Sequence, residues 1–241
     1  MYQYFTNKKV NNSFIIDGND FHHIKNVIKL KLKEHIHIVF NEQKYLCELE
    51  IIKESECIAK IISKIDITKN KFKPIINLYC GIIREQKWDY VLQKATELGV
   101  NNIYPVIFTR NVVKINSKDE DKKIFRWQSI IDTAAKQTKS IIIPKVGKII
   151  YNFKDIKIDN NYLNIICYEN EKNQNLKNIL NKNNLVNAIN IVIGPEGGFT
   201  DNEVTFFVKQ NFNSVSLGNN ILRAETVPLF VLSCLIYEYD M

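Results

Sequence analysis

Hydrophobic and polar residues alternate with a period of two along the first part of the chain, in the segments 14–16, 35–40, 45–52 and 57–62. Such alternation is typical of β-strands that bury one face. Between them, Phe21, Ile24, Val27 and Ile28 recur at helical spacing and predict a helix over about 20–29. We therefore expect residues 1–72 to form a small β-barrel of antiparallel strands with one short helix.

The pattern changes after Pro74, where short apolar runs alternate with longer amphipathic segments. The expected strands are 75–80, 103–108, 163–168, 188–193 and 214–217, and the expected helices are 87–98, 124–137, 173–181, 201–210 and 227–239. This alternation predicts an α/β domain, residues 73–241, in which helices cover both faces of a parallel sheet. The lysine-rich run 64–73 has no clear period and is expected to link the two domains.

Glycine is scarce and concentrated. Three of the 8 glycines lie in the loop 194–198, directly after the apolar run that ends at Ile193. Glycine allows a positive φ and a close approach to the backbone. The following Thr200-Asp201-Asn202-Glu203 matches a capping box, and the start of a helix favours a polar or anionic group. The loop matches neither GxGxxG nor the lysine-bearing phosphate loop, so a ligand site and a plain tight turn both remain open.

Two further polar loops follow predicted strands, at 168–170 and at 217–226. Ligands of open parallel sheets bind beyond the carboxyl ends of the strands, so the three loops are predicted to form one pocket. Arg223 and Glu225 stand just before the last helix. They either contact a ligand or form a structural ion pair with each other.

Composition narrows the choice of partner. The formal net charge is +7 and the isoelectric point is about 9.0, which favours a polyanion, with nucleic acid ahead of an anionic membrane. Lysines supply most of this charge. Because an arginine recognises planar groups through two parallel hydrogen bonds, the few arginines are the more informative cations. They are Arg84, Arg110, Arg126 and Arg223.

Other classes of site are not expected. The 5 cysteines are odd in number, widely spaced and without a CxxC pair, as in a protein of a reducing compartment. With no signal-peptide pattern and no membrane-length apolar run, we expect a cytoplasmic protein. His35 and His37 share one face of a predicted strand, but no carboxylate or cysteine cluster accompanies them, so no metal is expected. A GxSxG nucleophile elbow is absent as well.

The paired strings IGPEGGFTDNE, at 193–203, and LGNNILRAET, at 217–226, resemble the RsmE family of SPOUT methyltransferases, which act on uracil N3 of 16S rRNA. The resemblance extends to Lys87 and to residues 23–29, 93–100 and 127–144, and so spans the chain. It implies a PUA-like N-terminal barrel that holds RNA and a trefoil-knotted C-terminal domain that binds S-adenosylmethionine. It also implies a homodimer that acts on 16S rRNA in the 30S subunit.

The resemblance and the strand-end argument together assign roles to residues. Arg223 is expected to stabilise charge on the uracil oxygens, with Glu196 or Glu225 accepting the N3 proton or orienting Arg223. The expected cofactor-binding residues are Tyr168, Ile193, Gly194, Pro195, Glu196, Gly197, Gly198, Leu217, Gly218, Ile221, Leu222 and Thr226. The expected RNA-binding residues are His23, Lys25, Lys29, Lys87, Lys94 and Arg110.

The chain departs from the family where basic residues are usual. Asn26, Ser140 and Asn220 stand at such positions, and Lys29 replaces an arginine. Two other interpretations therefore stay open. One is a SPOUT methyltransferase of another specificity, acting on tRNA or on a ribose 2′-hydroxyl. The other is a relative that binds RNA with weak or no catalysis.

Overall fold

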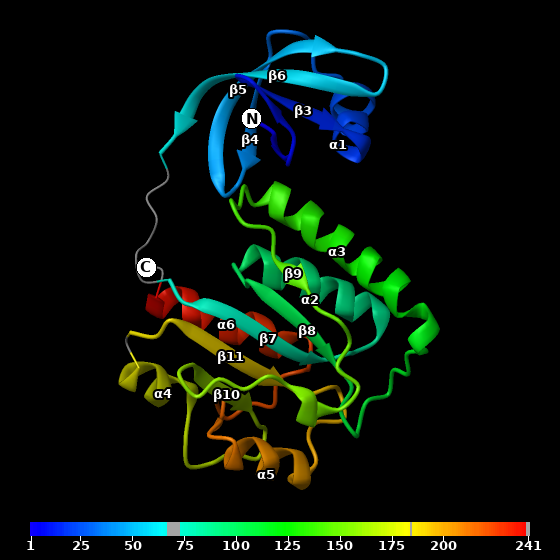
Figure 1. The fold of residues 1–241 in the computed structure, drawn as a ribbon. Helices are drawn as coiled ribbons and strands as arrows, with labels where there is room; N and C mark the ends of the chain where they lie inside the picture. The colour runs from blue at the N-terminus through cyan, green and yellow to red at the C-terminus, as the bar shows by residue number, and fades with distance from the viewer. Residues whose placement is uncertain (67–72, 184, 240–241) are drawn as a thin grey trace. The chain divides into compact units, whose positions relative to one another are not determined.

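The computed structural model describes residues 1–66, 73–183 and 185–239 (Figure 1). The chain forms two compact units, residues 1–69 with 135–142 and residues 70–134 with 143–241. Most of the expected linker 64–73, including the boundary after residue 72, lies outside the described residues. Lys64, at its start, belongs to a strand instead.

The first unit is built on a six-stranded sheet with the order β1-β4-β5-β6-β3-β2. Its strands are β1 (Gln3–Phe5), β2 (Lys9–Val10), β3 (Ser13–Asp17), β4 (His35–Phe40), β5 (Gln43–Ile52) and β6 (Glu56–Ile65). The pairs are antiparallel as predicted, except that the short β1, which the periodicity missed, runs parallel to β4. Alternate side chains such as Phe14, Ile16, Ile36 and Leu49 form the core of this unit.

The predicted helix at 20–29 has a different geometry. An α-helix, α1 (Gly18–His22), passes into a π-helix, η1 (His23–Ile28), which ends at Lys29 with a φ of 58°. A π-turn contains more residues than an α-turn, so the side chains rotate around the axis. Ile24 is fully buried while Val27 is 57% exposed, so the expected common face of these two residues is wrong.

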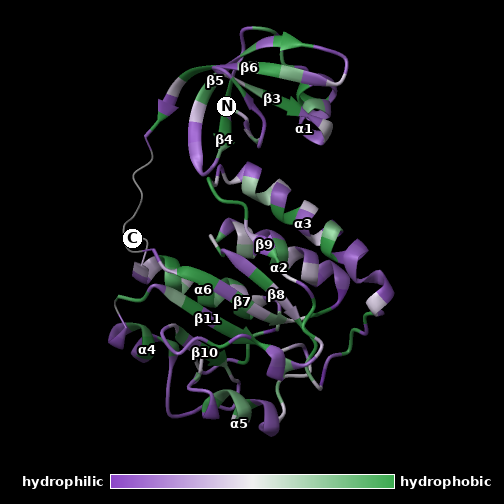
Figure 2. Ribbon diagram, in the orientation of Figure 1, coloured by the Kyte–Doolittle hydropathy of each residue, from purple (hydrophilic) through white to green (hydrophobic). Residues whose placement is uncertain are grey.

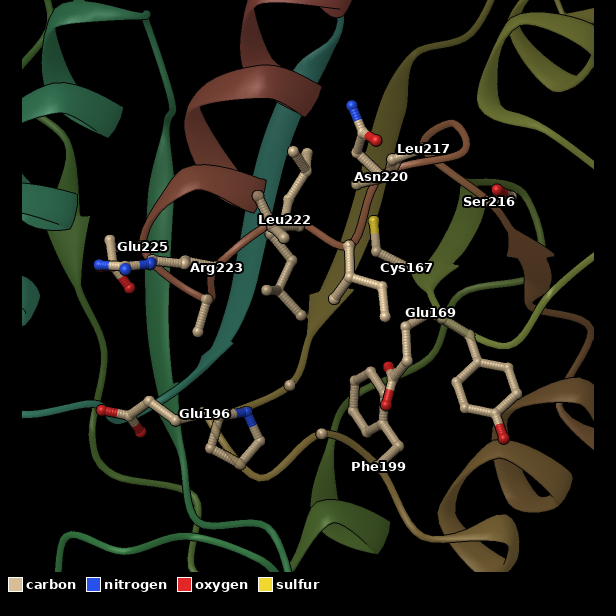
Figure 3. A pocket seen from close by; sticks show the side chains of 18 of the residues that line it. Cys167, Glu169, Glu196, Phe199, Ser216, Leu217, Asn220, Leu222, Arg223 and Glu225 are labelled. Atoms are coloured by element: carbon tan, nitrogen blue, oxygen red, sulfur yellow. The ribbon is translucent and has the colours of Figure 1, made fainter.

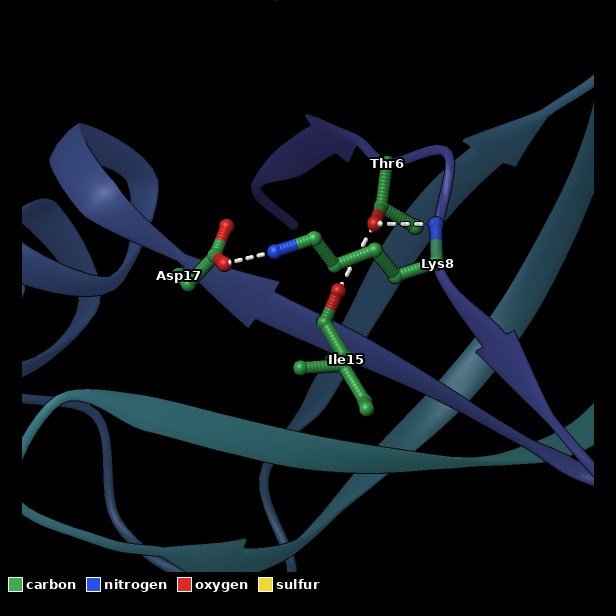
Figure 4. A network of polar contacts seen from close by, with 4 residues as sticks. All are labelled: Thr6, Lys8, Ile15 and Asp17. Carbon is green, nitrogen blue, oxygen red and sulfur yellow. Dashed lines mark hydrogen bonds and ion pairs between the residues drawn. The ribbon is translucent and has the colours of Figure 1, made fainter.

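A polar network holds the short edge strands of this unit in place (Figure 4). The Thr6 hydroxyl donates to the Ile15 carbonyl (2.7 Å) and accepts from the Lys8 backbone N–H (3.1 Å). The Lys8 ammonium is paired with Asp17. Because both charged side chains are about half exposed, we expect the ion pair to add little stability. The Thr6–Ile15 hydrogen bond, together with the one that the Ile15 N–H donates to the Lys8 carbonyl (3.0 Å), connects the segment after β1 to β3.

The last turn of a helix from the second domain belongs to the first unit, which sequence reasoning did not foresee. Residues 135–142 include the end of α3 (Glu120–Gln137) and the loop after it. There, Lys136 Nζ lies 2.5 Å from Asp20 Oδ1. Gln3 Nε2 donates to the Ser140 carbonyl at the same distance. These contacts join residues more than 100 positions apart, which no local pattern predicts.

The second unit contains a six-stranded sheet, order β12-β10-β11-β7-β8-β9, in which every pair is parallel. The strands are β7 (Ile75–Gly81), β8 (Asn102–Val106), β9 (Lys145–Val146), β10 (Leu163–Cys167), β11 (Ala188–Ile193) and β12 (Asn213–Val215). Figure 2 shows β11 and helix α6 as mainly hydrophobic. All residues of β10 and β11 are buried, which explains their continuous apolar runs.

Helices pack on both faces of this sheet. The core on one face joins the strands to α2 (Glu85–Glu97), α3, α4 (Leu176–Lys182) and α6 (Thr226–Tyr239). The core on the other face joins them to α5 (Asp201–Lys209) and to aromatic side chains such as Phe153, Phe199 and Phe212. The predicted α/β class, with helices on both faces of a parallel sheet and a separate N-terminal sheet, is confirmed.

Some predicted boundaries move by a few residues. Helix α4 begins at Leu176 rather than at 173, because the Asn175 side chain accepts the Asn178 N–H and so caps the helix there. Strand β12 ends at Val215, two residues early. Thr226 is the first residue of α6 rather than its N-cap, and the short β9 was not predicted.

Asparagines form a hydrogen-bonded ladder inside the parallel sheet. Asn102 donates to Asn77 (2.8 Å), Asn77 to Asn190 (2.9 Å), and Asn190 to Asn164 (2.8 Å). These four residues lie directly opposite one another in the strand register. The last amide, Asn164, donates to the Asp159 carbonyl (3.0 Å). A shift of any of these strands by one residue would leave buried amides unpaired, so the ladder fixes the register.

Candidate functional site

The three strand-end loops of the second unit surround one cavity of about 540 Å³ (Figure 3). They follow β10, β11 and β12, as predicted. Every predicted cofactor-binding residue lines this cavity except Thr226, whose N–H donates to the Arg223 carbonyl in the first turn of α6. Arg223, Glu196 and Glu225 also line it, and so does Lys87. The volume is in the range of about 300–1,000 Å³ typical of small-molecule sites.

The glycines of the loop 194–198 make close approaches within the chain itself. A Cβ on Gly197 would lie 2.7 Å from the Arg110 carbonyl oxygen. Gly198 has a φ of +67°, and its Cβ would collide with the Glu169 carboxylate. We had expected a ligand to explain the small residue at both positions. The structure gives an intramolecular reason for each, so the shape of the loop is fixed by its neighbours.

Gly81, at the end of β7, supports the same loop from below and was missed by sequence reasoning. A Cβ here would lie 2.5 Å from the Pro195 nitrogen and 2.9 Å from the Gly194 carbonyl carbon. Both of these are backbone atoms that cannot move aside without distorting the loop. The signal available in the sequence was a glycine that ends an apolar strand, which by itself has several explanations.

The predicted capping box is confirmed, and its Glu203 side chain also contacts a residue outside helix α5. The Thr200 side chain accepts the Glu203 N–H, and Glu203 Oε2 accepts the Thr200 N–H. The other oxygen, Oε1, accepts the Thr109 N–H at 2.8 Å. Glu203 is fully buried yet has partners for both oxygens. It therefore anchors the turn that carries Arg110, whose Nη1 donates to the Gly197 carbonyl (3.3 Å).

Glu225 is paired with a lysine rather than with Arg223. Its Oε1 lies 2.8 Å from Lys87 Nζ on α2. Partial burial raises the pKa of Glu225. Hydrogen bonds from Lys87 and from the Glu225 backbone N–H, together with the charges of Lys87 and Arg223, outweigh burial and hold the pKa below its ordinary value. Of the two roles left open for Arg223, the ion pair with Glu225 is therefore wrong. Arg223 is exposed on the cavity wall.

The other carboxylates of the cavity differ from Glu225 in their surroundings. Glu196 Oε1 accepts the backbone N–H of Arg84, the N-cap of α2, at 3.1 Å. Glu196 is exposed, and a helix start stabilises its negative charge. In Figure 3, Glu196, Arg223 and Glu225 lie toward one side of the view, and Cys167 and Glu169 toward the other. The cavity thus has one wall with a free guanidinium between carboxylates.

The predicted RNA-binding residues are divided between the two units. In the second unit, Lys94 pairs with Glu97 (2.8 Å), while Lys87 and Arg110 have the contacts described above. In the first unit, His23 Nδ1 is hydrogen-bonded to the Tyr4 hydroxyl (3.0 Å). Lys25 donates to the Lys53 carbonyl (3.0 Å), and Lys29 is exposed. Only Lys29 among these six is exposed and has a side chain without a hydrogen bond or ion pair in the described part of the chain.

Sequence reasoning missed several residues of the cavity wall. They are Cys167, Glu169, Phe199, Ser216, Asn219, Asn220, Ala224 and Val227. All of them flank predicted residues in the same loops, so adjacency was the available signal. Lys87, which was predicted to bind RNA, also lines the cavity, and it comes from helix α2 rather than from a strand-end loop.

Comparison with known proteins now identifies the family. A model of the RNA methyltransferase domain matches residues 70–236, and a model of the RNA methyltransferase PUA domain matches residues 16–62. The ribosomal RNA small subunit methyltransferase E of Mesomycoplasma hyopneumoniae is 37% identical, over 97% of this chain and 98% of its own length. The chain belongs to this RNA methyltransferase family. The predicted resemblance to the RsmE methyltransferases, and the expectation of an enzyme, are confirmed.

Other members of the methyltransferase family support the same conclusion. The Bacillus subtilis small subunit methyltransferase E is 29% identical, over 95% of this chain and 91% of its own length. The crystal structure of the Neisseria gonorrhoeae enzyme, solved with S-adenosylmethionine bound, has a TM-score of 0.87 at 28% identity, covering 98% of this chain and 97% of that one. The fold of this chain is thus that of the family.

The described residues contain no candidate for a metal site or for a membrane-spanning helix. Within 1–66, 73–183 and 185–239, no three histidine, cysteine or acidic side chains come together in a group that could hold a metal. In the same ranges, each helix is too short or too polar to cross a bilayer.

Proposed function

We propose that this methyltransferase transfers a methyl group from S-adenosylmethionine to N3 of a specific uridine in 16S rRNA, within the 30S subunit. The observation that carries the proposal is the cavity, which three strand-end loops surround and which Arg223, Glu225 and Glu196 line. Relatives named for small subunit rRNA methylation, and one solved with S-adenosylmethionine, support the substrate and the methyl donor.

The cavity suits the methyl donor in its chemistry. Ile193, Leu217 and Leu222 offer apolar surface for an adenine ring. The backbone N–H groups of Leu217 and Leu222 donate no hydrogen bond within the described residues, so they remain available to a polar ligand. The carboxylates of Glu169, Glu196 and Glu225 match the positive charge of the amino acid and sulfonium groups. When bound, S-adenosylmethionine supplies an electrophilic methyl group.

Arg223 is proposed to stabilise the transition state. Uracil N3 is a weak nucleophile while it carries its proton, and negative charge develops on O2 and O4 as the proton leaves. A guanidinium at the cavity wall stabilises that charge with planar, paired donors. Its exposure and the absence of an ion pair with Glu225 leave it available to substrate.

Glu225 is the stronger candidate for the proton acceptor. Glu196 already accepts the Arg84 N–H and is exposed to water. Glu225 is only 16% exposed at its side chain, and its Oε2 is buried without a partner in the described part of the chain. A general base needs a lone pair within reach of the proton that it removes. Glu225 Oε2 offers a lone pair that no donor occupies within the described residues, and Glu196 would then serve as electrostatic support.

The first unit is proposed to hold RNA, in line with its match to the PUA domain of RNA methyltransferases. The exposed Lys29, together with His23 and Lys25, is the proposed contact surface. A homodimer is supported by helix α6, where Phe230 is 41% and Tyr237 74% exposed. Large apolar side chains exposed on one helix are typical of protein interfaces. The five free cysteines support a cytoplasmic location, where thiols stay reduced.

A methyl-transfer assay tests the proposal. The full-length protein is incubated with 30S particles from a source lacking this modification and with S-adenosylmethionine labelled in the methyl group, and the labelled nucleoside is mapped. We expect label at N3 of one uridine. Label on tRNA or on a ribose 2′-oxygen would support another RNA specificity. No transfer on 30S, free rRNA or tRNA would support an RNA-binding relative without catalysis.

A further inference from the structure

Lys87 occupies an unexpected place for a surface cation. It lies in the first turns of α2, and its Nζ reaches the Glu225 carboxylate at 2.8 Å, beside Arg223. Its side chain is 39% exposed and lines the same cavity. An isolated surface lysine would be expected to contact RNA phosphates, as we predicted. This one is directed at a carboxylate of the candidate active site.

The two oxygens of Glu225 are not equivalent. Oε1 is the partner of Lys87, whereas Oε2 is buried and has no hydrogen bond within the described residues. A buried carboxylate oxygen without a donor loses its hydration and gains no hydrogen bond in return, which destabilises the protein. Such groups are rare, and one in a cavity wall has a natural partner in a ligand that donates a hydrogen bond.

The charges around Glu225 favour its ionised form. Lys87 from α2 and Arg223 from the preceding loop are the cations that face it, and Glu196 is the nearby carboxylate of the loop 194–198. Burial is the largest single influence and opposes ionisation, but the hydrogen bonds from Lys87 and the backbone N–H and the charges of Lys87 and Arg223 together outweigh it, so the pKa of Glu225 lies below its ordinary value. Without Lys87, only the charge of Arg223 and the hydrogen bond from the backbone N–H would counteract the effect of burial on the pKa of Glu225.

We propose that Lys87 is a positioning residue, which holds Glu225 ionised through Oε1, so that the buried and unpartnered Oε2 accepts a proton from the RNA base when that base enters the cavity. The inference rests on the proposed function. In this step the N–H bond of the base nitrogen breaks, its electron pair stays on the nitrogen, and Oε2 takes the proton. Glu225 becomes a neutral carboxyl group and later returns the proton to water. Lys87 keeps its own protons throughout.

The first test follows the Glu225 carboxyl directly and needs no catalysis. The protein is labelled with ¹³C at the glutamate carboxyl carbons, and the signal of Glu225 is assigned by its loss in E225Q. We expect K87M to raise the pKa of Glu225 by about 1–3 units, as for the loss of an opposite charge at contact distance. K87R keeps the charge and should restore most of the shift. An unchanged pKa in a folded K87M would overturn the proposal.

The second test is the pH profile of single-turnover methylation on 30S particles. The acid limb of K87M should move to higher pH by about the same amount, because Glu225 then protonates earlier, while the rate at high pH changes much less. E225Q should be slow at every pH. Superimposable profiles for K87M and wild type would overturn the role of Lys87.

The control is R126M, which removes the ion pair between Arg126 and Asp89 of α2, the helix that carries Lys87. Arg126 Nη2 lies 2.5 Å from Asp89 Oδ2. Asp89 is two residues from Lys87 in α2, and neither Arg126 nor Asp89 lines the cavity. We expect R126M to leave the pKa of Glu225 and the pH profile unchanged, and an equal shift in R126M would overturn the assignment to Lys87. If wild type labels no RNA while K87M still raises the pKa of Glu225, the proposed function fails but the coupling stands.

Discussion

The two ends of the parallel sheet in the second unit are organised on opposite principles. Toward the amino ends of the strands, Asn102, Asn77, Asn190 and Asn164 pair amide to amide across four strands. At the carboxyl ends, the chain leaves polar groups without partners in the described residues, including Glu225 Oε2 and the N–H groups of Leu217 and Leu222. One end satisfies its buried polar atoms internally, and the other offers them to a ligand.

The comparison teaches how one sheet combines a fixed register with a reactive edge. Asn190 and Gly194 are only four residues apart on the same strand and loop, so the register set by the ladder determines where the loop begins. A side chain on Gly81 would collide with Gly194 and Pro195 of this loop, and a side chain on Gly197 would collide with Arg110. The loop 194–198 is therefore held in place by the close packing of its neighbours.

The largest effect is expected from breaking the ladder at its centre. Asn190→Ala removes the acceptor of the Asn77 amide N–H and the donor to Asn164 Oδ1, and so leaves one buried donor and one buried acceptor unpaired. At about 1–3 kcal/mol for each group, plus the cavity left behind, we expect the free energy of unfolding to fall by about 3–5 kcal/mol. Urea denaturation measures this loss. Asn202→Ala, on the exposed face of α5, should change stability by less than about 0.5 kcal/mol. A loss below about 1 kcal/mol for Asn190→Ala would mean that the ladder does not hold the register.

The next largest effect concerns the reactive end. Arg223→Lys keeps the charge but loses the planar donors, so the single-turnover methylation rate should fall by roughly 100-fold or more, as for a lost oxyanion donor. The affinity for S-adenosylmethionine and for RNA should change little, because the interaction matters mainly in the transition state. Rapid-quench measurements with labelled methyl donor test this. A rate within about threefold of wild type would assign Arg223 to a structural role.

A smaller effect should follow from pushing the glycine loop out of place. Gly81→Ala places a methyl group 2.5 Å from the Pro195 nitrogen, so the loop must shift, and we expect the affinity for S-adenosylmethionine to fall by about tenfold. Calorimetric titration measures the change. Gly147→Ala is the matched control, because its Cβ would meet the Tyr104 ring at the same distance of 2.5 Å, away from the cavity. Equal affinities in the two variants would show that Gly81 does not shape the site.

The smallest effect is expected outside the parallel sheet. Lys29 is the exposed, unpaired cation among the predicted RNA-binding residues, and Lys29→Gln should lower RNA affinity only modestly. Removing one phosphate contact should reduce the slope of log affinity against log salt by about 0.7–0.9. Filter binding over a range of salt concentrations gives this slope. Lys172→Gln, an exposed lysine in the loop after β10, should leave it unchanged. An unchanged slope in Lys29→Gln would remove this residue from the RNA contact.

Local patterns were sufficient for much of the fold. The apolar runs of β10 and β11 and the capping box of Thr200 and Glu203 were predicted at nearly the right positions, because hydrophobic period and capping depend on residues close in sequence. The same locality explains the errors. Nothing within a few residues of Ile24 reveals the π-turn that exposes Val27.

The sequence by itself determined the order of the strands and helices, the three strand-end loops and the family to which their motifs belong. The tertiary structure alone decided which side chains meet: Lys87 with Glu225, Asn77 with Asn190, and Gly81 with Pro195. The partners in each of these pairs are more than 100 positions apart. A hydrogen bond or a steric contact depends on distance in space, and only the closed sheet, with its fixed strand order and register, brings such distant residues to within a few ångströms of each other.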